Sequence, residues 1–184
     1  MQTLMDRVRA VWVRIRSVWD RSTRRLRGGR VYSDLRSMAL GVDPATIRRL
    51  DGERWTGAAV AAMEIGLAGS GAAVTIVAIA DGTVSMYTSP GGGVLGAGEH
   101  AAVRGAGDRF RAVVAESHGL LQRSQSFPAP KEGEVRFHAR IGDDRLTAAA
   151  PEAQLRTGRH LLSPLYDGGQ DLLTEIRLAS EPEP

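Results

Sequence analysis

A long apolar run followed by a two-residue turn constrains the fold of this chain more than any other feature. Residues 72–80 are nearly all apolar, which favours a strand that is covered on both faces. Asp81-Gly82 follows, and a second β-like run, Thr83–Thr88, begins directly after it. An Asp-Gly pair between two such runs is a strong hairpin signal. The sequence therefore predicts an antiparallel hairpin over residues 72–88.

A second hairpin is predicted over residues 134–150. Residues 134–141 alternate strictly between polar and apolar side chains, as expected of a strand with one solvent-exposed face. A turn at Gly142-Asp143-Asp144 leads into the partner strand. The face expected to meet water carries Glu134, Arg136, His138 and Arg140.

Three helices are predicted to pack on this sheet, over about residues 53–67, 99–121 and 164–178. The first has an alanine-rich face, and the last begins at Ser163-Pro164. Shorter helical segments are expected from Ser33 to Leu40, from Pro44 to Leu50 and at residues 151–157. The predicted fold class is α+β, with a mostly antiparallel sheet made of two hairpins.

The order of elements, which is helices, hairpin, helix, hairpin and helix, resembles that of known scaffolding modules. Over residues 53–178 it is similar to roadblock/LC7-type and related profilin-like modules. The resemblance lies in element order and carries no residue roles. It implies a non-catalytic interaction domain.

Residues 1–27 have the periodicity of an amphipathic helix. Three adjacent rows form its apolar arc: Leu4, Val11 and Val18; Val8 and Ile15; and Met5, Trp12, Trp19 and Leu26. At about 100° per residue these rows cover an arc roughly 100° wide. Arginines border the arc, with Arg7, Arg14 and Arg21 on one side and Arg9 and Arg16 on the other.

The basic charge of the chain is concentrated in this segment. Residues 1–30 hold nine arginines and two aspartates, a balance of +7, whereas the rest of the chain holds fifteen basic and nineteen acidic residues, a balance of −4. Only one basic residue of the chain, Lys131, is a lysine, so we attribute the arginine abundance mainly to coding bias rather than to nucleic-acid binding. We expect an N-terminal helix with a glycine hinge over residues 1–30, a single domain over 31–179, and a disordered tail over 180–184.

Three roles suit an apolar stripe with tryptophans and arginine borders. Such a helix packs on protein (the chain's own body, a second copy or a partner), lies on an anionic membrane surface, or forms a mobile or nucleic-acid-binding arm. We favour protein contact. The docking residues would then be Leu4, Val8, Val11, Trp12, Ile15, Val18 and Trp19, with Arg7, Arg9, Arg14 and Arg16 beside them.

A glycine-rich crossing over residues 89–98 connects the first hairpin to the next helix. Gly91, Gly93 and Gly96 match a dinucleotide-binding pattern, but the acid expected about 20 residues on falls at Glu116, inside the predicted helix. We therefore favour a close crossing of the core over a nucleotide site. A weaker alternative is an anion held by the backbone N–H groups of Gly96, Ala97 and Gly98 at the helix start, although Glu99 would compete for that position.

No arrangement of side chains in the sequence indicates catalysis, a metal site or a cofactor. The chain has no cysteine, its four histidines lack metal-ligand spacing, and Asp81, Asp143 and Asp144 lie in predicted turns. No apolar run approaches the roughly 20 residues of a membrane span. We expect a cytoplasmic, non-enzymatic adaptor, with membrane-surface anchoring at the inner face as the second hypothesis and small-ligand binding at the crossing as the third.

Overall fold

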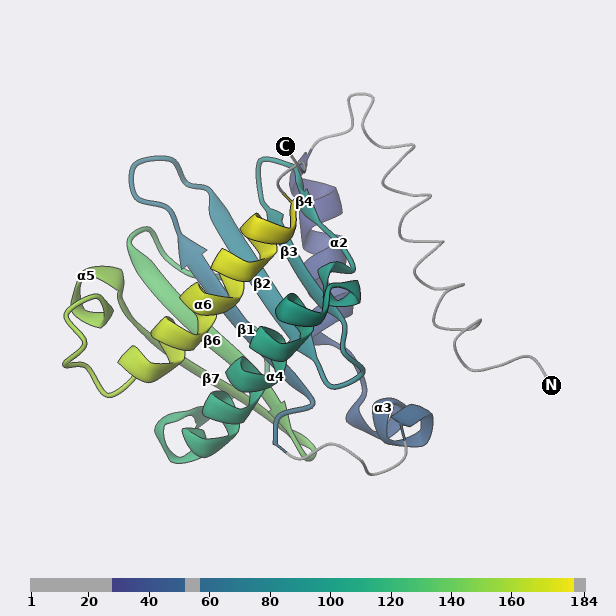
Figure 1. Cartoon of the computed structure of the whole chain (residues 1–184). Helices are drawn as coiled ribbons and strands as arrows, with labels where there is room; N and C mark the ends of the chain where they lie inside the picture. Colours follow the sequence, from purple (N-terminus) through teal and green to yellow (C-terminus); the bar gives the residue numbers. More distant parts are fainter. Residues whose placement is uncertain (1–27, 52–56, 181–184) are drawn as a thin grey trace.

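The computed structural model describes residues 28–51 and 57–180 as a three-layer α/sheet/α arrangement (Figure 1). Two long helices, α4 (Ala101–Glu116) and α6 (Ser163–Ser180), lie across one face of a sheet. Helix α2 (Gly28–Leu40) lies on the opposite face, where it contacts β1, β2 and β6. The predicted α+β class is confirmed.

The described residues form one antiparallel sheet of seven strands in the order β4-β3-β2-β1-β6-β7-β5. The strands are β1 (Val60–Gly66), β2 (Ala73–Ile79), β3 (Val84–Thr88), β4 (Gly93–Val94), β5 (Gln122–Arg123), β6 (Glu134–Ile141) and β7 (Asp144–Pro151). Both predicted hairpins are present, as β2–β3 and β6–β7. Shorter elements complete the chain: α3 (Pro44–Asp51), η1 (Ala97–Glu99), η2 (His118–Leu120) and α5 (Glu152–Leu155).

The helix predicted over residues 53–67 is wrong, because its second half is the central strand β1. All seven residues of β1 are buried, since helices cover both faces of the sheet. Ala61 and Met63 face the α4/α6 side, whereas Ala62 faces the α2 side. Because both faces carry small apolar residues, the sequence lacks the two-residue alternation typical of a strand. The spacing of its alanines is also compatible with the buried face of a helix.

Several helix boundaries also differ from the predictions, and helix α6 runs to Ser180, the first residue of the predicted disordered tail. Helix α2 includes Gly28 and Gly29, so its start lies before the predicted cap at Ser33 and within the predicted hinge. Helix α4 ends at Glu116, and the residues up to Leu120 form the separate turn η2. The predicted N-terminal helix and the last four residues of the predicted tail lie outside the described residues.

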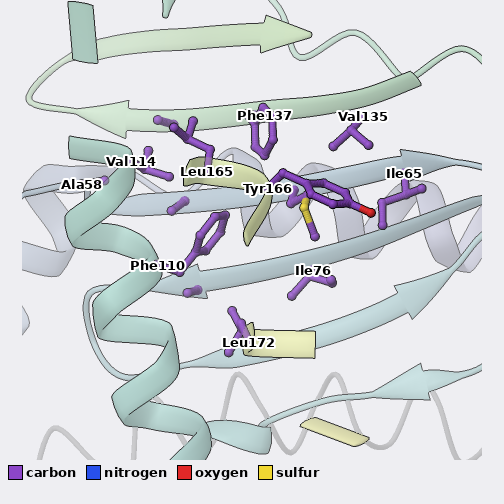
Figure 2. Packing of buried hydrophobic residues seen from close by; sticks show 14 of the residues in the cluster. Ala58, Ile65, Ile76, Phe110, Val114, Val135, Phe137, Leu165, Tyr166 and Leu172 are labelled. Atoms are coloured by element: carbon purple, nitrogen blue, oxygen red, sulfur yellow. The ribbon is translucent and has the colours of Figure 1, made fainter. Parts of the chain in front are cut away.

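The larger apolar core lies between the sheet and helices α4 and α6 (Figure 2). Phe110 of α4, Phe137 of β6 and Leu172 of α6 are fully buried there. Helix α6 approaches β1 closely at Gly169, where an added Cβ would lie 2.5 Å from Met63 Sδ. This tight packing fixes one face of the sheet, and α2 covers the other.

Candidate functional site

Polar side chains from three strands meet beneath α2. Glu64 of β1 stands at the centre, opposite Thr75 of β2 in the register of the sheet. His138 of β6 lies next to it. The side chains of Glu64, Thr75 and His138 are all fully buried, which is rare for an acid. A buried charge of this kind requires partners.

Arg36 of α2 supplies the main partner through a two-pronged ion pair. Its Nε and Nη2 atoms each donate to one oxygen of Glu64, both at 2.7 Å. The Nη2 atom also donates to the carbonyl oxygen of Phe127 at 2.8 Å. The planar guanidinium group suits this geometry, because it presents parallel N–H donors to both carboxylate oxygens. Arg36 thus ties α2, β1 and the loop after β5 together.

Two further donors complete the hydrogen bonding of the Glu64 carboxylate. Thr75 Oγ1 donates to Oε1 at 2.7 Å, and His138 Nε2 lies 3.0 Å from Oε2. Because a carboxylate only accepts, Nε2 is the donor in this contact. His138 Nδ1 is buried and has no hydrogen-bond partner among the described residues. Tyr32 Oη lies 2.8 Å from Thr75 Oγ1 and extends the network to the first turns of α2.

The side chains around Glu64 keep its carboxylate ionised. Burial alone would raise the pKa of Glu64, but the hydrogen bonds and charges of His138 and Arg36 outweigh it and lower the pKa to about 2. Burial disfavours the charged form of Arg36, yet the hydrogen bond and charge of Glu64 raise its pKa overall. A carboxylate that is inaccessible and accepts several hydrogen bonds is a poor general base. The arrangement acts as a clamp that fixes α2 on the sheet, and we call Arg36, Glu64, Thr75 and His138 the clamp.

The prediction that the polar face of β6 meets water is wrong. His138 is fully buried, and Arg140 is only 8% exposed. The alternation of residues was interpreted correctly as a strand, but α2 covers the face that was expected to be wet. Polar alternation reports which residues share a face, and it does not show whether another element binds there through polar contacts.

The structure places the predicted anion-binding residues at a close crossing. The Gly96 N–H donates to Ser85 Oγ at 3.2 Å, and Ala97 and Gly98 are buried. An added Cβ at Gly98 would lie 1.9 Å from the carbonyl oxygen of Gly82. Helix α4 begins only at Ala101, after η1, rather than at the predicted Glu99. Packing thus explains Gly98, whereas Gly96 has a positive φ of 73° and nothing within 4 Å of an added Cβ. Anion binding at this position stays a prediction.

Replacing Gly98 with alanine tests the close crossing. We expect the free energy of unfolding to fall by about 1–3 kcal/mol, because the new methyl group overlaps rigid backbone that must move. Gly119→Ala is the matched control, since nothing lies within 4 Å of an added Cβ there. Urea unfolding of the two variants gives the comparison. Equal stabilities would show that the crossing is looser than described.

The other sequence-predicted candidates divide into two groups. The docking residues, from Leu4 to Trp19, lie outside the described residues. Of the histidines, His100 precedes α4 and is exposed, with no side-chain capping bond. Within residues 28–51 and 57–180 there is no group of three or more metal-ligating side chains. No helix in that same part of the chain combines the length and apolarity needed to cross a membrane.

Sequence reasoning missed three residues of the clamp, namely Arg36, Glu64 and Thr75. One signal was present, because Glu64 is the only charged residue in the run from residue 57 to 67. Once that run is interpreted as a strand, its acid must be buried, and a buried acid requires a cationic partner such as arginine.

Comparison with protein-family models, with curated proteins and with solved structures finds no match. The function is therefore inferred from the residues of this chain.

Proposed function

We propose that this protein is a non-enzymatic interaction module whose N-terminal amphipathic segment docks on a partner protein or a second copy of the chain. The observation that carries the proposal is the combination of a sheet that packs on helices at both faces, in the described residues, with an apolar stripe in the sequence of residues 1–27. The stripe contains Trp12 and Trp19, the kind of large side chains that dominate interface energies.

The packing of the body supports this division of roles. One face of the sheet packs on α4 and α6, and the other packs on α2 through a second apolar cluster that includes Leu40, Val77 and Tyr87. The described helices therefore cover the centre of the sheet on both faces. An amphipathic helix over residues 1–27 would then have its apolar face left to bind another surface.

The clamp also supports a non-catalytic function. Its carboxylate is fully buried, ionised, and bonded to Arg36, Thr75 and His138. These contacts hold an element in place and leave no oxygen directed at a substrate.

The full-length double variant Trp12→Glu/Trp19→Glu tests the proposal. We expect wild-type protein to self-associate with rising concentration, or to retain a partner on purification from its native cells, and the double variant to lose at least tenfold in that affinity. Ser17→Glu is the matched control, because at about 100° per residue it lies opposite the apolar arc. Light scattering measures self-association, and circular dichroism checks that all variants fold.

Two outcomes would contradict docking on protein. Equal association of the wild type and the double variant would show that the stripe does not lie in the interface.

The tryptophans and arginine borders also favour the membrane surface as a second candidate. Flotation of the wild type, but not of the double variant, with anionic vesicles would assign the segment to lipid if no protein association is found.

A further inference from the structure

A second polar feature, apart from the clamp, lies at the hairpin end of β6 and β7. Arg140 and Arg145 are direct partners in the register of these antiparallel strands. Residues that pair in this way point to the same face, here the α2 face, with their Cβ atoms about 5 Å apart. Two like charges placed directly opposite each other destabilise a sheet unless something compensates them.

Arg140 is poorly compensated. The residue is only 8% exposed, and its Nε atom is buried with no hydrogen-bond partner among the described residues. A buried N–H donor without an acceptor is costly, because it loses water and gains no hydrogen bond in exchange. Burial and the neighbouring charge of Arg145 accordingly lower the pKa of Arg140.

The acids that face Arg140 offset its charge only from a distance. Asp43 and Asp143 act on it through their charges, without a hydrogen bond or ion pair to it in the described structure. The carboxylate of Asp43 accepts from Ala45 N and Thr46 Oγ1 at the start of α3, both at 3.0 Å. Neither acid is thus hydrogen-bonded to the Arg140 side chain in the described structure.

Arg145 is the accessible member of the pair. It is exposed, its Cζ atom lies 5.8 Å from the centre of the Phe127 ring, and Nη1 donates to the carbonyl oxygen of Gln125 at 3.3 Å. Stacking on an aromatic ring and one backbone acceptor orient the side chain while leaving other N–H donors available. A ligand can therefore approach from the side of Arg145.

We propose that Arg140 and Arg145 form a binding site for a phosphate-type oxyanion, distinct from the clamp and from the docking segment. The two guanidinium groups supply a charge of +2 that Asp43 and Asp143 offset only from a distance, and a phosphate dianion balances this charge better than a single carboxylate does. Its several oxygens can accept hydrogen bonds from N–H groups of both arginines at once. The proposal is independent of the proposed docking function.

Titration of the full-length protein with inorganic phosphate, at ionic strength held constant with sodium chloride, tests this site. We expect a saturable rise of the wild-type melting temperature, and a separate calorimetric titration to show at least tenfold weaker phosphate binding by Arg145→Gln. Arg123→Gln is the control, because Arg123 is an exposed arginine on neighbouring β5 and pairs with Asp144 at 2.9 Å. This control is expected to bind phosphate like the wild type.

A second variant separates binding from folding. Arg140→Met removes the buried cation, so it should retain its fold without phosphate and show no phosphate-dependent rise in melting temperature. The proposal is overturned if the wild-type melting temperature does not respond to phosphate, if Arg123→Gln weakens binding as much as Arg145→Gln does, or if sodium acetate at the same ionic strength stabilises the protein equally.

Discussion

Replacing Arg36 with methionine is expected to lower the free energy of unfolding by about 3 kcal/mol. Methionine fills much of the same space, so the loss comes mainly from leaving the Glu64 carboxylate buried without its cation. Removing one partner of a buried ion pair typically costs about 3–5 kcal/mol. We expect the lower end of that range, because Thr75 and His138 still hydrogen-bond the carboxylate. Urea unfolding followed by circular dichroism measures the change.

An exposed ion pair in the same protein provides the control. The side chains of Arg123 and Asp144 pair at 2.9 Å but are 80% and 33% exposed, so Arg123→Met should cost no more than about 1 kcal/mol. In the double variant Arg36→Met/Glu64→Gln the loss should be smaller than the sum of the two single losses, since no unpaired charge remains. Equal losses for Arg36→Met and Arg123→Met would contradict the clamp.

Acid is expected to weaken the fold through Glu64. Its pKa is about 2 in the folded protein and 4.5 in the unfolded chain, so the unfolded state binds the proton more tightly. The stabilisation is therefore complete above pH about 4.5 and is lost as the pH falls toward 2. A lowering of this size corresponds to about 3 kcal/mol at neutral pH.

The free energy of unfolding, measured from pH 7 to pH 2 for the wild type and Glu64→Gln, isolates this contribution. The difference between the two proteins should shrink by about 3 kcal/mol across that range. Glu116→Gln, at the exposed end of α4, is the control for removing one carboxylate outside the clamp. A wild-type advantage over Glu64→Gln that is independent of pH would show that Glu64 titrates alike in both states.

The hairpins were predictable from the sequence because their signals are local. Asp81-Gly82 and Gly142-Asp143 specify turns, and the alternation over residues 134–141 specifies a strand. Strand β1 was not predictable, because burial on both faces removes the alternation of polar and apolar residues. What remains is an alanine-rich run that is compatible with a helix or a strand. The local signal there was overridden by the tertiary position of the strand.

The clamp was not predictable for a related reason. Arg36 and Glu64 are 28 residues apart, and Glu64 and His138 are 74 apart, so only the packing of α2 on the sheet brings them together. His138 was identified as part of a polar face, but its burial depends on that same helix. Charge pattern alone does not distinguish a solvated face from one that is covered by a matching charge.

Glu64 is a closed structural anchor that stays charged at neutral pH, and not a reaction centre. Carbon-13 NMR titration of its side-chain carboxyl group, assigned by comparison with Glu64→Gln, tests this most directly. We predict a midpoint near pH 2, with no change in chemical shift between pH 4 and pH 8. A midpoint at or above pH 4.5 would mean that the carboxyl group exchanges protons like an ordinary or a catalytic acid, and would contradict the account.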